Sequence, residues 1–408
     1  MNAGPARNVT LYPWFRFCHG LIFWQAVWFL YFQSELSASE AILLYVVFDV
    51  SATALEVPLG YMSDRIGRRI TLILSSITGA LSALLIALGS SFEVFALANV
   101  LLGAWVALSS GTDSAFLFES LVADKREHEI EAQELRAWRF SFTASAISAV
   151  IGGYLASVAS SLPYFAATIA LAVSTYIGFL FHEVKTDRST KDGLTQTGTV
   201  QAITSTLKKP VLVWLFVLSL LMYIFSHIPF VFGQPFILEA LAARGLDGDA
   251  PIISGVVSST MMLVSVIVSL FALKIRGWIG LAPILLIAFF MQIALAGILA
   301  LTNSIIAIGF LFLRMVPDSL SKPFILARIQ PELPDESRAT YLSLQSFCGR
   351  LIFAATLFFA SGTTSGDGQM IYSEIRIVLG GYVLVGILCL AGLFWAARRI
   401  EIDNDKTA

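Results

Sequence analysis

Ionisable side chains occur inside several long apolar stretches of this 408-residue sequence. Asp49 and Glu56 lie in the stretch "YVVFDVSATALEVPLG", and their spacing puts both carboxyl groups on one face of a helix. Ionisable residues at membrane depth are costly and usually functional. Because burial favours the protonated form of a carboxyl group, these two residues are candidates for binding and releasing a proton. The alternative for Glu56 is a structural contact beside Pro58.

Buried cations form a second group of candidates. Arg314, Asp318 and Lys322 follow one another at four-residue intervals in "FLFLRMVPDSLSKPF", so they share one helix face. Arg350 lies midway along the next apolar stretch, in "LSLQSFCGRLIF", and needs an acid. Asp318, Asp49 or Glu56 could supply it. Two deep arginines would suit a carboxylate or phosphate substrate. An Arg314–Asp318 ion pair would instead be structural, and both interpretations stay open.

Polar and aromatic residues of two other apolar stretches could complete a binding pocket. In "YIFSHIPFVFGQPF", Pro229 and Pro235 predict a broken helix, which often marks a binding site or a hinge in transport proteins. A lone histidine in such a stretch is more often a hydrogen-bonded core residue than a proton carrier. The pocket candidates are Tyr223, His227, Gln234, Gln25 and Trp28.

The composition indicates what kind of protein positions these residues. Hydrophobic residues make up 57% of the sequence and charged residues only 13%, whereas soluble domains are about 25% charged. A membrane-crossing helix needs about 20 apolar residues. We therefore expect an all-α integral membrane protein with twelve transmembrane helices, near residues 14–33, 40–62, 70–90, 93–114, 137–159, 162–182, 210–240, 251–273, 277–301, 303–326, 339–361 and 375–397.

One long polar stretch divides these segments into two halves. We expect six-helix bundles at residues 1–182 and 210–398, a cytoplasmic central linker at 183–209 and a cytoplasmic tail at 399–408. The formal net charge of −2 argues against a nucleic-acid partner. The three cysteines lie in apolar runs, without the spacing of a metal site or a disulfide framework, and the sequence indicates no cofactor.

Lysine and arginine are distributed unequally between the two sets of loops. One set carries almost all of them, whereas the opposite set holds only Arg244 and Arg376. The positive-inside rule places the basic set in the cytoplasm. This predicts a multi-pass protein of the cytoplasmic (inner) membrane with both termini inside. The N-terminal residues have no cleavage site after a short apolar core, so we expect an uncleaved cytoplasmic end.

The loop between the second and third expected helices reads "GYMSDRIGRR". In its place and spacing it resembles the signature loop of the major facilitator superfamily, Gly-x-x-x-Asp-Arg-x-Gly-Arg-Arg/Lys. The matching residues are Gly60, Asp64, Arg65, Gly67, Arg68 and Arg69. The likeness extends over the whole chain, with twelve spans, two halves and a polar central linker. It is to twelve-span bacterial permeases in the size class of drug–proton antiporters.

The resemblance implies a cytoplasmic gate. An acid at the end of helix four, here Asp113 or Glu119, would pair with Arg65 or Arg68. Asp64 would bind the N-terminus of helix eleven, tying the two halves together on the cytoplasmic face. The stretch "SAISAVIGGYLA" in helix five is similar to the antiporter motif of the family, but "SA" stands where that motif has Gly-Pro. This difference weakens the case for antiport.

These features predict a secondary active transporter and not an enzyme. The sequence contains no phosphate-binding loop of the Gly-x-x-x-x-Gly-Lys-Ser/Thr type and no Gly-x-Ser-x-Gly motif. We expect alternating access around a midplane site for a small organic solute, with a proton, or less favourably sodium, as the coupling ion. The basic residues favour an anionic or zwitterionic substrate. Multidrug efflux is the alternative within this class, and a lipid flippase or a non-transporting receptor lies outside it. The family expectation is a monomer.

Overall fold

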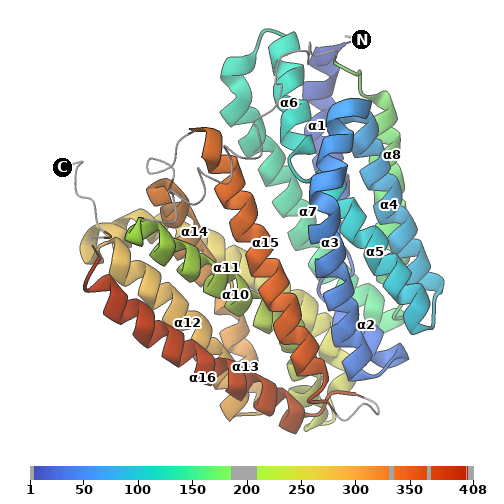
Figure 1. Ribbon diagram of the computed structural model, residues 1–408. Helices are drawn as coiled ribbons and strands as arrows, with labels where there is room; N and C mark the ends of the chain where they lie inside the picture. Colours follow the sequence, from blue (N-terminus) through green and yellow to red (C-terminus); the bar gives the residue numbers. More distant parts are fainter. Residues whose placement is uncertain (1–3, 185–208, 330–334, 365–368, 401, 403–408) are drawn as a thin grey trace. The chain divides into compact units, whose positions relative to one another are not determined.

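A computed structural model of the chain describes residues 4–184, 209–329, 335–364, 369–400 and 402 (Figure 1). Within these ranges the chain forms helices joined by turns, and no strand occurs. This confirms the all-α class that the sequence predicted. The expected central linker is described only at its two ends, and most of the expected tail lies outside the described residues.

The first of two compact units is built mainly from Met1–Thr190. In this unit α4 packs against both α5 and α8, and α1 packs against α6, α7 and α8. A buried cluster of aromatic and aliphatic side chains joins α1 to α6 and to the end of α8. The helices are α1 (Pro5–His19), α2 (Trp28–Glu35), α3 (Ala38–Ile66), α4 (Arg68–Leu88), α5 (Phe92–Ser109), α6 (Thr112–Ala123), α7 (Ile130–Val158) and α8 (Leu162–Leu180).

The second unit comprises Lys191–Asp247, Thr260–Ser365 and Met370–Ala408. Here α10 packs against α12, α14, α15 and α16, and α12 runs beside α16 (Figure 1). The helices are α10 (Pro210–Ala242), α11 (Ala250–Ile279), α12 (Leu281–Leu301), α13 (Ile305–Phe310), α14 (Val316–Ile329), α15 (Asp335–Ser361) and α16 (Tyr372–Ala397). Gly248–Ser259, which includes the first ten residues of α11, groups with the first unit.

Ten helical segments in the described residues are long and apolar enough to cross a membrane. The other two expected spans, near 14–33 and 303–326, are interrupted helices, and the structure is consistent with the expected twelve. The first breaks between α1 and α2, and the second passes from α13 through a 3-10 turn, Leu311–Leu313, into α14. The fourth span is also longer than expected, since α6 continues it beyond a turn at Ser110 and Gly111.

Contacts with α7 satisfy the backbone where the first span is interrupted. The Ser145 hydroxyl donates to the carbonyl of Gly20 at 3.2 Å, and the Gln25 amide donates to the carbonyl of Ser145 at 2.7 Å. Gly152 lies so close to the carbonyl of Phe23 that a Cβ atom would overlap with it. Non-helical backbone at membrane depth is tolerated where it is buried in protein, and α7 provides that cover.

The seventh span shows the opposite departure from expectation. Pro229 and Pro235 lie inside α10, which continues without a break from Pro210 to Ala242. The predicted break is therefore wrong. Prolines are tolerated in transmembrane helices because neighbouring helices and side chains satisfy the backbone groups that they leave unbonded.

Candidate substrate site and signature loop

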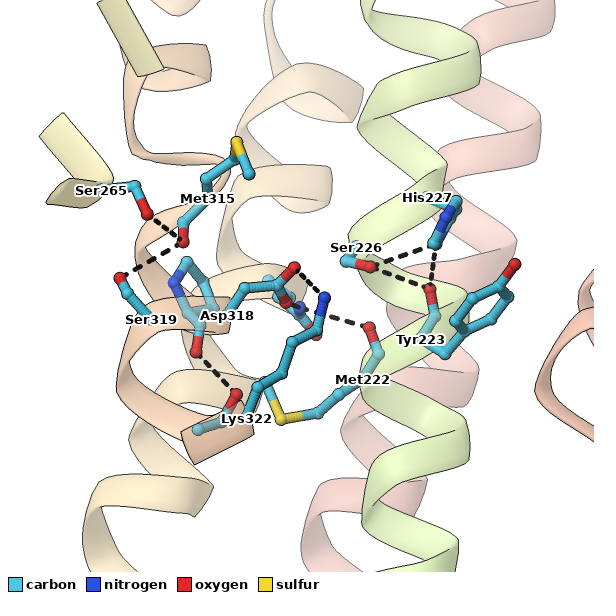
Figure 2. Close-up of polar contacts among 12 residues, drawn as sticks. Met222, Tyr223, Ser226, His227, Ser265, Met315, Asp318, Ser319 and Lys322 are labelled. Carbon is cyan, nitrogen blue, oxygen red and sulfur yellow. Dashed lines mark hydrogen bonds and ion pairs between the residues drawn. The ribbon is translucent and has the colours of Figure 1, made fainter. Parts of the chain in front are cut away.

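A polar network joins α10, α12 and α14 within the second unit (Figure 2). The ammonium group of Lys322 binds the carboxylate of Asp318 at 2.7 Å. The amide of Gln292 donates to the other carboxylate oxygen at 3.4 Å and to the carbonyl of Met222 at 3.3 Å. The Asp318 side chain is 16% exposed and that of Lys322 is 64% exposed. The Asp318 carboxylate is therefore mostly buried within the unit, whereas the Lys322 side chain is accessible.

His227 lies on α10 beside this network. Its Nδ1 is 2.7 Å from the carbonyl of Tyr223, and its ring lies against the Tyr223 ring with 4.1 Å between the centroids. A carbonyl oxygen can only accept a hydrogen bond, so Nδ1 carries the proton. This leaves Nε2 as the second polar atom of the imidazole. Arg314, Lys322 and Arg350 all lie close enough to His227 to act on it electrostatically.

A cavity of about 300 Å³ lies between α10, α14 and α15. This volume is at the lower end of the range for small-molecule sites. Tyr223 and Lys322 line it, whereas His227 lies one turn beyond Tyr223. The lining also includes hydroxyl, amide and apolar side chains that the sequence did not single out: Ser219, Met222, Ser321, Ile325, Leu326, Ile329, Gln345 and Ser346.

The two deep arginines have different surroundings. Arg314 lies in the turn between Leu313 and α14, where its guanidinium stacks on the Phe230 ring at 5.0 Å and reaches the sulfur of Met261 at 3.7 Å. The carboxylate of Asp318, which the sequence suggested as a partner for Arg314, binds Lys322. Arg350 lies on α15, and its buried Nε has no hydrogen-bond partner among the described residues.

The proton-coupling candidates lie on α3 in the first unit. Asp49 is 2% exposed, and the Thr53 hydroxyl donates to its backbone carbonyl at 2.7 Å. Glu56 is half-buried and accepts a long hydrogen bond of 3.4 Å from Ser110, at the turn between α5 and α6. Asp49 is therefore the more deeply buried of the two carboxyl groups.

The remaining pocket candidates are packed within their own units. Gln25 holds α7 through the hydrogen bond to Ser145. Trp28 is 4% exposed and lies edge-to-face against Phe29. Gln234 is 7% exposed on α10. The first two of these have clear packing roles.

A second polar cluster surrounds the end of α1, and the sequence analysis missed it. Arg16 forms an ion pair with Asp113 of α6. One turn further on, His19 Nε2 accepts a hydrogen bond of 2.7 Å from the Trp105 indole and lies 3.3 Å from the Ser75 hydroxyl. Arg16 and His19 are charged or titratable residues at the edge of an apolar run, and that position is the signal that could have identified them.

Most signature-loop contacts lie within the first unit. Arg68 pairs with Glu119 at 3.4 Å and donates to Ser63 at 2.9 Å. This confirms one of the ion pairs that the family resemblance implied. Of the other residues offered for this pairing, Arg65 contacts Tyr61 and Asp113 binds Arg16. The side chain of Asp64, and with it the proposed contact to helix eleven, lies outside the described residues.

Comparisons with known proteins agree with this architecture. The sequence model of the Major Facilitator Superfamily matches residues 15–357. The chain therefore belongs to this superfamily, as a multi-pass membrane protein and a secondary transporter rather than an enzyme. No curated protein matches the sequence.

Several solved transporters share the fold at low sequence identity. The nucleoside transporter NupG is 14% identical, with a TM-score of 0.72 over 95% of this chain and 98% of its own. A bacterial homologue of the human lysosomal transporter Spinster, inward-facing and occupied, is 13% identical, with a TM-score of 0.72 over 97% and 98%. A D-xylose–proton symporter is 13% identical, with a TM-score of 0.70 over 99% of each chain. At this identity the likeness extends to the fold alone.

Proposed function

We propose that this transporter moves a small organic anion or zwitterion and couples its movement to protons. The proposal is carried by the Asp318–Lys322 ion pair on α14, with 2.7 Å between nitrogen and oxygen, and by Arg350 on α15, whose buried Nε has no hydrogen-bond partner among the described residues. Three basic side chains and a single carboxylate in this part of the second unit favour a ligand that brings a negative charge. Lys322 also lines the adjacent cavity, where an anionic group could reach its ammonium.

The proton-coupling step is assigned to carboxyl groups at membrane depth. Asp49 is the first candidate because it is almost fully buried, and Glu56 is the second. Asp318 is a third, since an anion that binds Lys322 competes with its carboxylate. In alternating access, the substrate site and the protonated carboxyl group would be exposed first to one side of the membrane and then to the other.

The location and orientation of the protein form part of the same proposal. The unequal distribution of lysine and arginine supports the cytoplasmic membrane, with both termini and the signature loop inside. The Arg68–Glu119 pair supports a gating role for that loop. We propose a monomer as the working unit.

A ligand screen by thermal shift tests the substrate class. Purified protein is mixed with organic anions, zwitterions, lipophilic cations and sugars at two pH values, because a ligand that binds the folded state raises the melting temperature. We expect an anion or a zwitterion to stabilise the protein, and Lys322→Gln and Arg350→Gln to remove the shift. Arg244→Ala, in the exposed loop after α10, is the matched control and should retain it.

The opposite result favours the second candidate function. The apolar side of the cavity, with Met222, Ile325 and Ile329, would suit an amphipathic compound. If lipophilic cations alone stabilise the protein, and Asp49→Asn removes their effect, the cations around His227 are structural and drug efflux replaces anion transport.

A further inference from the structure

The chain is held firmly at the point where it leaves α8. Phe181 is 3% exposed, and its ring packs against Phe15 of α1 and Phe116 of α6, with centroids 5.4 and 4.6 Å away. We call residues 181–184, which run from the end of α8 into the first two residues of the central linker, the linker anchor. Since the core cluster contains Phe181, the linker anchor starts from a fixed position.

Asn8 of α1 binds the next residue through its backbone. The Asn8 side-chain amide donates to the carbonyl of His182 at 2.8 Å, and its side-chain oxygen accepts from the His182 amide at 2.7 Å. The same amide lies 3.0 Å from the hydroxyl of Ser120 on α6. Asn8 is fully buried. Both backbone polar groups of His182 are therefore satisfied by one side chain from a distant helix.

The third residue of the linker anchor reaches the signature loop. The carboxylate of Glu183 lies against Gly67, so closely that a Cβ atom on Gly67 would come within 2.5 Å of its Oε1. Gly67 is the N-cap of α4, with φ 102° and no side-chain cap of its own. A carboxylate is favoured at a helix N-terminus, where backbone amides point outward. Arg69, in the first turn of α4, also binds the carbonyl of Phe179 at 2.9 Å.

We infer that the linker anchor is a strap that couples the signature loop to the central linker. Glu183 holds the strap to the N-terminus of α4, and Asn8 holds it to α1 and α6. A glycine is required at position 67 for two reasons: the backbone has a positive φ, and the Glu183 carboxylate occupies the space of a side chain. Neither reason applies to Gly60, the other glycine of the signature, since a Cβ atom there would meet nothing within 4 Å. A displacement of the start of α4 must therefore displace the start of the linker.

Hydrogen–deuterium exchange of the full-length protein tests this coupling without any substrate. Gly67→Ala acts in the signature loop, and we expect it to speed exchange of the peptide covering residues 179–184 at least threefold. Asn8→Ala acts at the other end, and we expect it to speed exchange of residues 66–70, which Asn8 does not bind in the described structure. Glu183→Gln keeps the side-chain shape and should speed exchange at both places.

Two controls separate coupling from general loosening. Gly60→Ala, in the same motif, should leave exchange of 179–184 unchanged. Gly67→Ala combined with Glu183→Ala should exchange no faster at 179–184 than Glu183→Ala alone, because the contact that transmits a displacement of α4 has been removed. The inference is overturned if Gly67→Ala and Glu183→Gln leave 179–184 at the wild-type rate in folded protein, or if Gly60→Ala has the same effect as Gly67→Ala. Neither result bears on the substrate class, so this inference and the proposed function fail separately.

Discussion

Replacement of Asp318 by asparagine should abolish proton-coupled transport while leaving the protein almost as stable as before. The Asp318–Lys322 pair is short, at 2.7 Å, but the lysine side chain is 64% exposed. Exposed ion pairs one helical turn apart contribute about 0.3–0.5 kcal/mol. Breaking a fully buried pair costs about 3–5 kcal/mol, because it leaves a charge without compensation. Because the Lys322 side chain is mostly exposed, the smaller value applies.

The expected loss of stability is small, so the melting temperature is measured first. One kcal/mol corresponds to about 2–4 °C in the melting temperature of a domain of 150–250 residues, so we expect Asp318→Asn to lower it by about 2 °C or less. Transport is then measured as uphill uptake driven by an imposed pH gradient in proteoliposomes, with a ligand found in the thermal-shift screen. Lys322→Gln is the matched variant, and it should lose ligand binding as well as transport.

Two outcomes would refute this reasoning. If Asp318→Asn unfolds the protein by more than about 3 kcal/mol, the value for a buried pair, the pair is a structural element of α14. If the variant is stable and still drives uphill transport with a pH gradient, Asp318 has no part in coupling, and Asp49 and Glu56 are left as the candidates.

Two further predictions concern packing and pH. Gly386→Ala should destabilise the protein by about 1–3 kcal/mol, because its Cβ would lie 2.7 Å from the ring of Phe225. Gly392→Ala is the control, since its Cβ would meet no atom within 4 Å. Equal melting temperatures of the two variants would contradict this prediction. Hydrogen bonds from Arg126 lower the pKa of Glu129, in the turn before α7, from 4.5 to about 2. The stabilising effect of this contact is present at neutral pH and is lost as the pH falls from about 4.5 to about 2. Arg126→Gln should raise the pKa of Glu129 in a carboxyl NMR titration, and an unchanged midpoint would contradict the assignment.

Some site contacts could be predicted because the sequence places the partners in a known framework. The Arg68–Glu119 pair follows from the signature loop and the acid at the end of the fourth span. Four-residue spacing on one helix placed Asp318 beside both Arg314 and Lys322, and the structure pairs it with Lys322. Asp113 shows the limit of this approach. It binds Arg16 of α1, and nothing in the local sequence distinguishes that partner from the arginines of the loop.

The sequence alone determined that the protein is an all-α membrane transporter with a signature loop between its second and third spans. Each of these features depends on composition, on apolar segment length or on a short motif, and all three are local. Only the tertiary structure decided where helices are interrupted and which polar groups meet. After the break at Gly20, the Ser145 hydroxyl of α7 donates a hydrogen bond to the carbonyl of Gly20. At Pro229, in contrast, α10 continues unbroken. The His19–Trp105 hydrogen bond joins residues 86 positions apart, a distance that only helix packing can close.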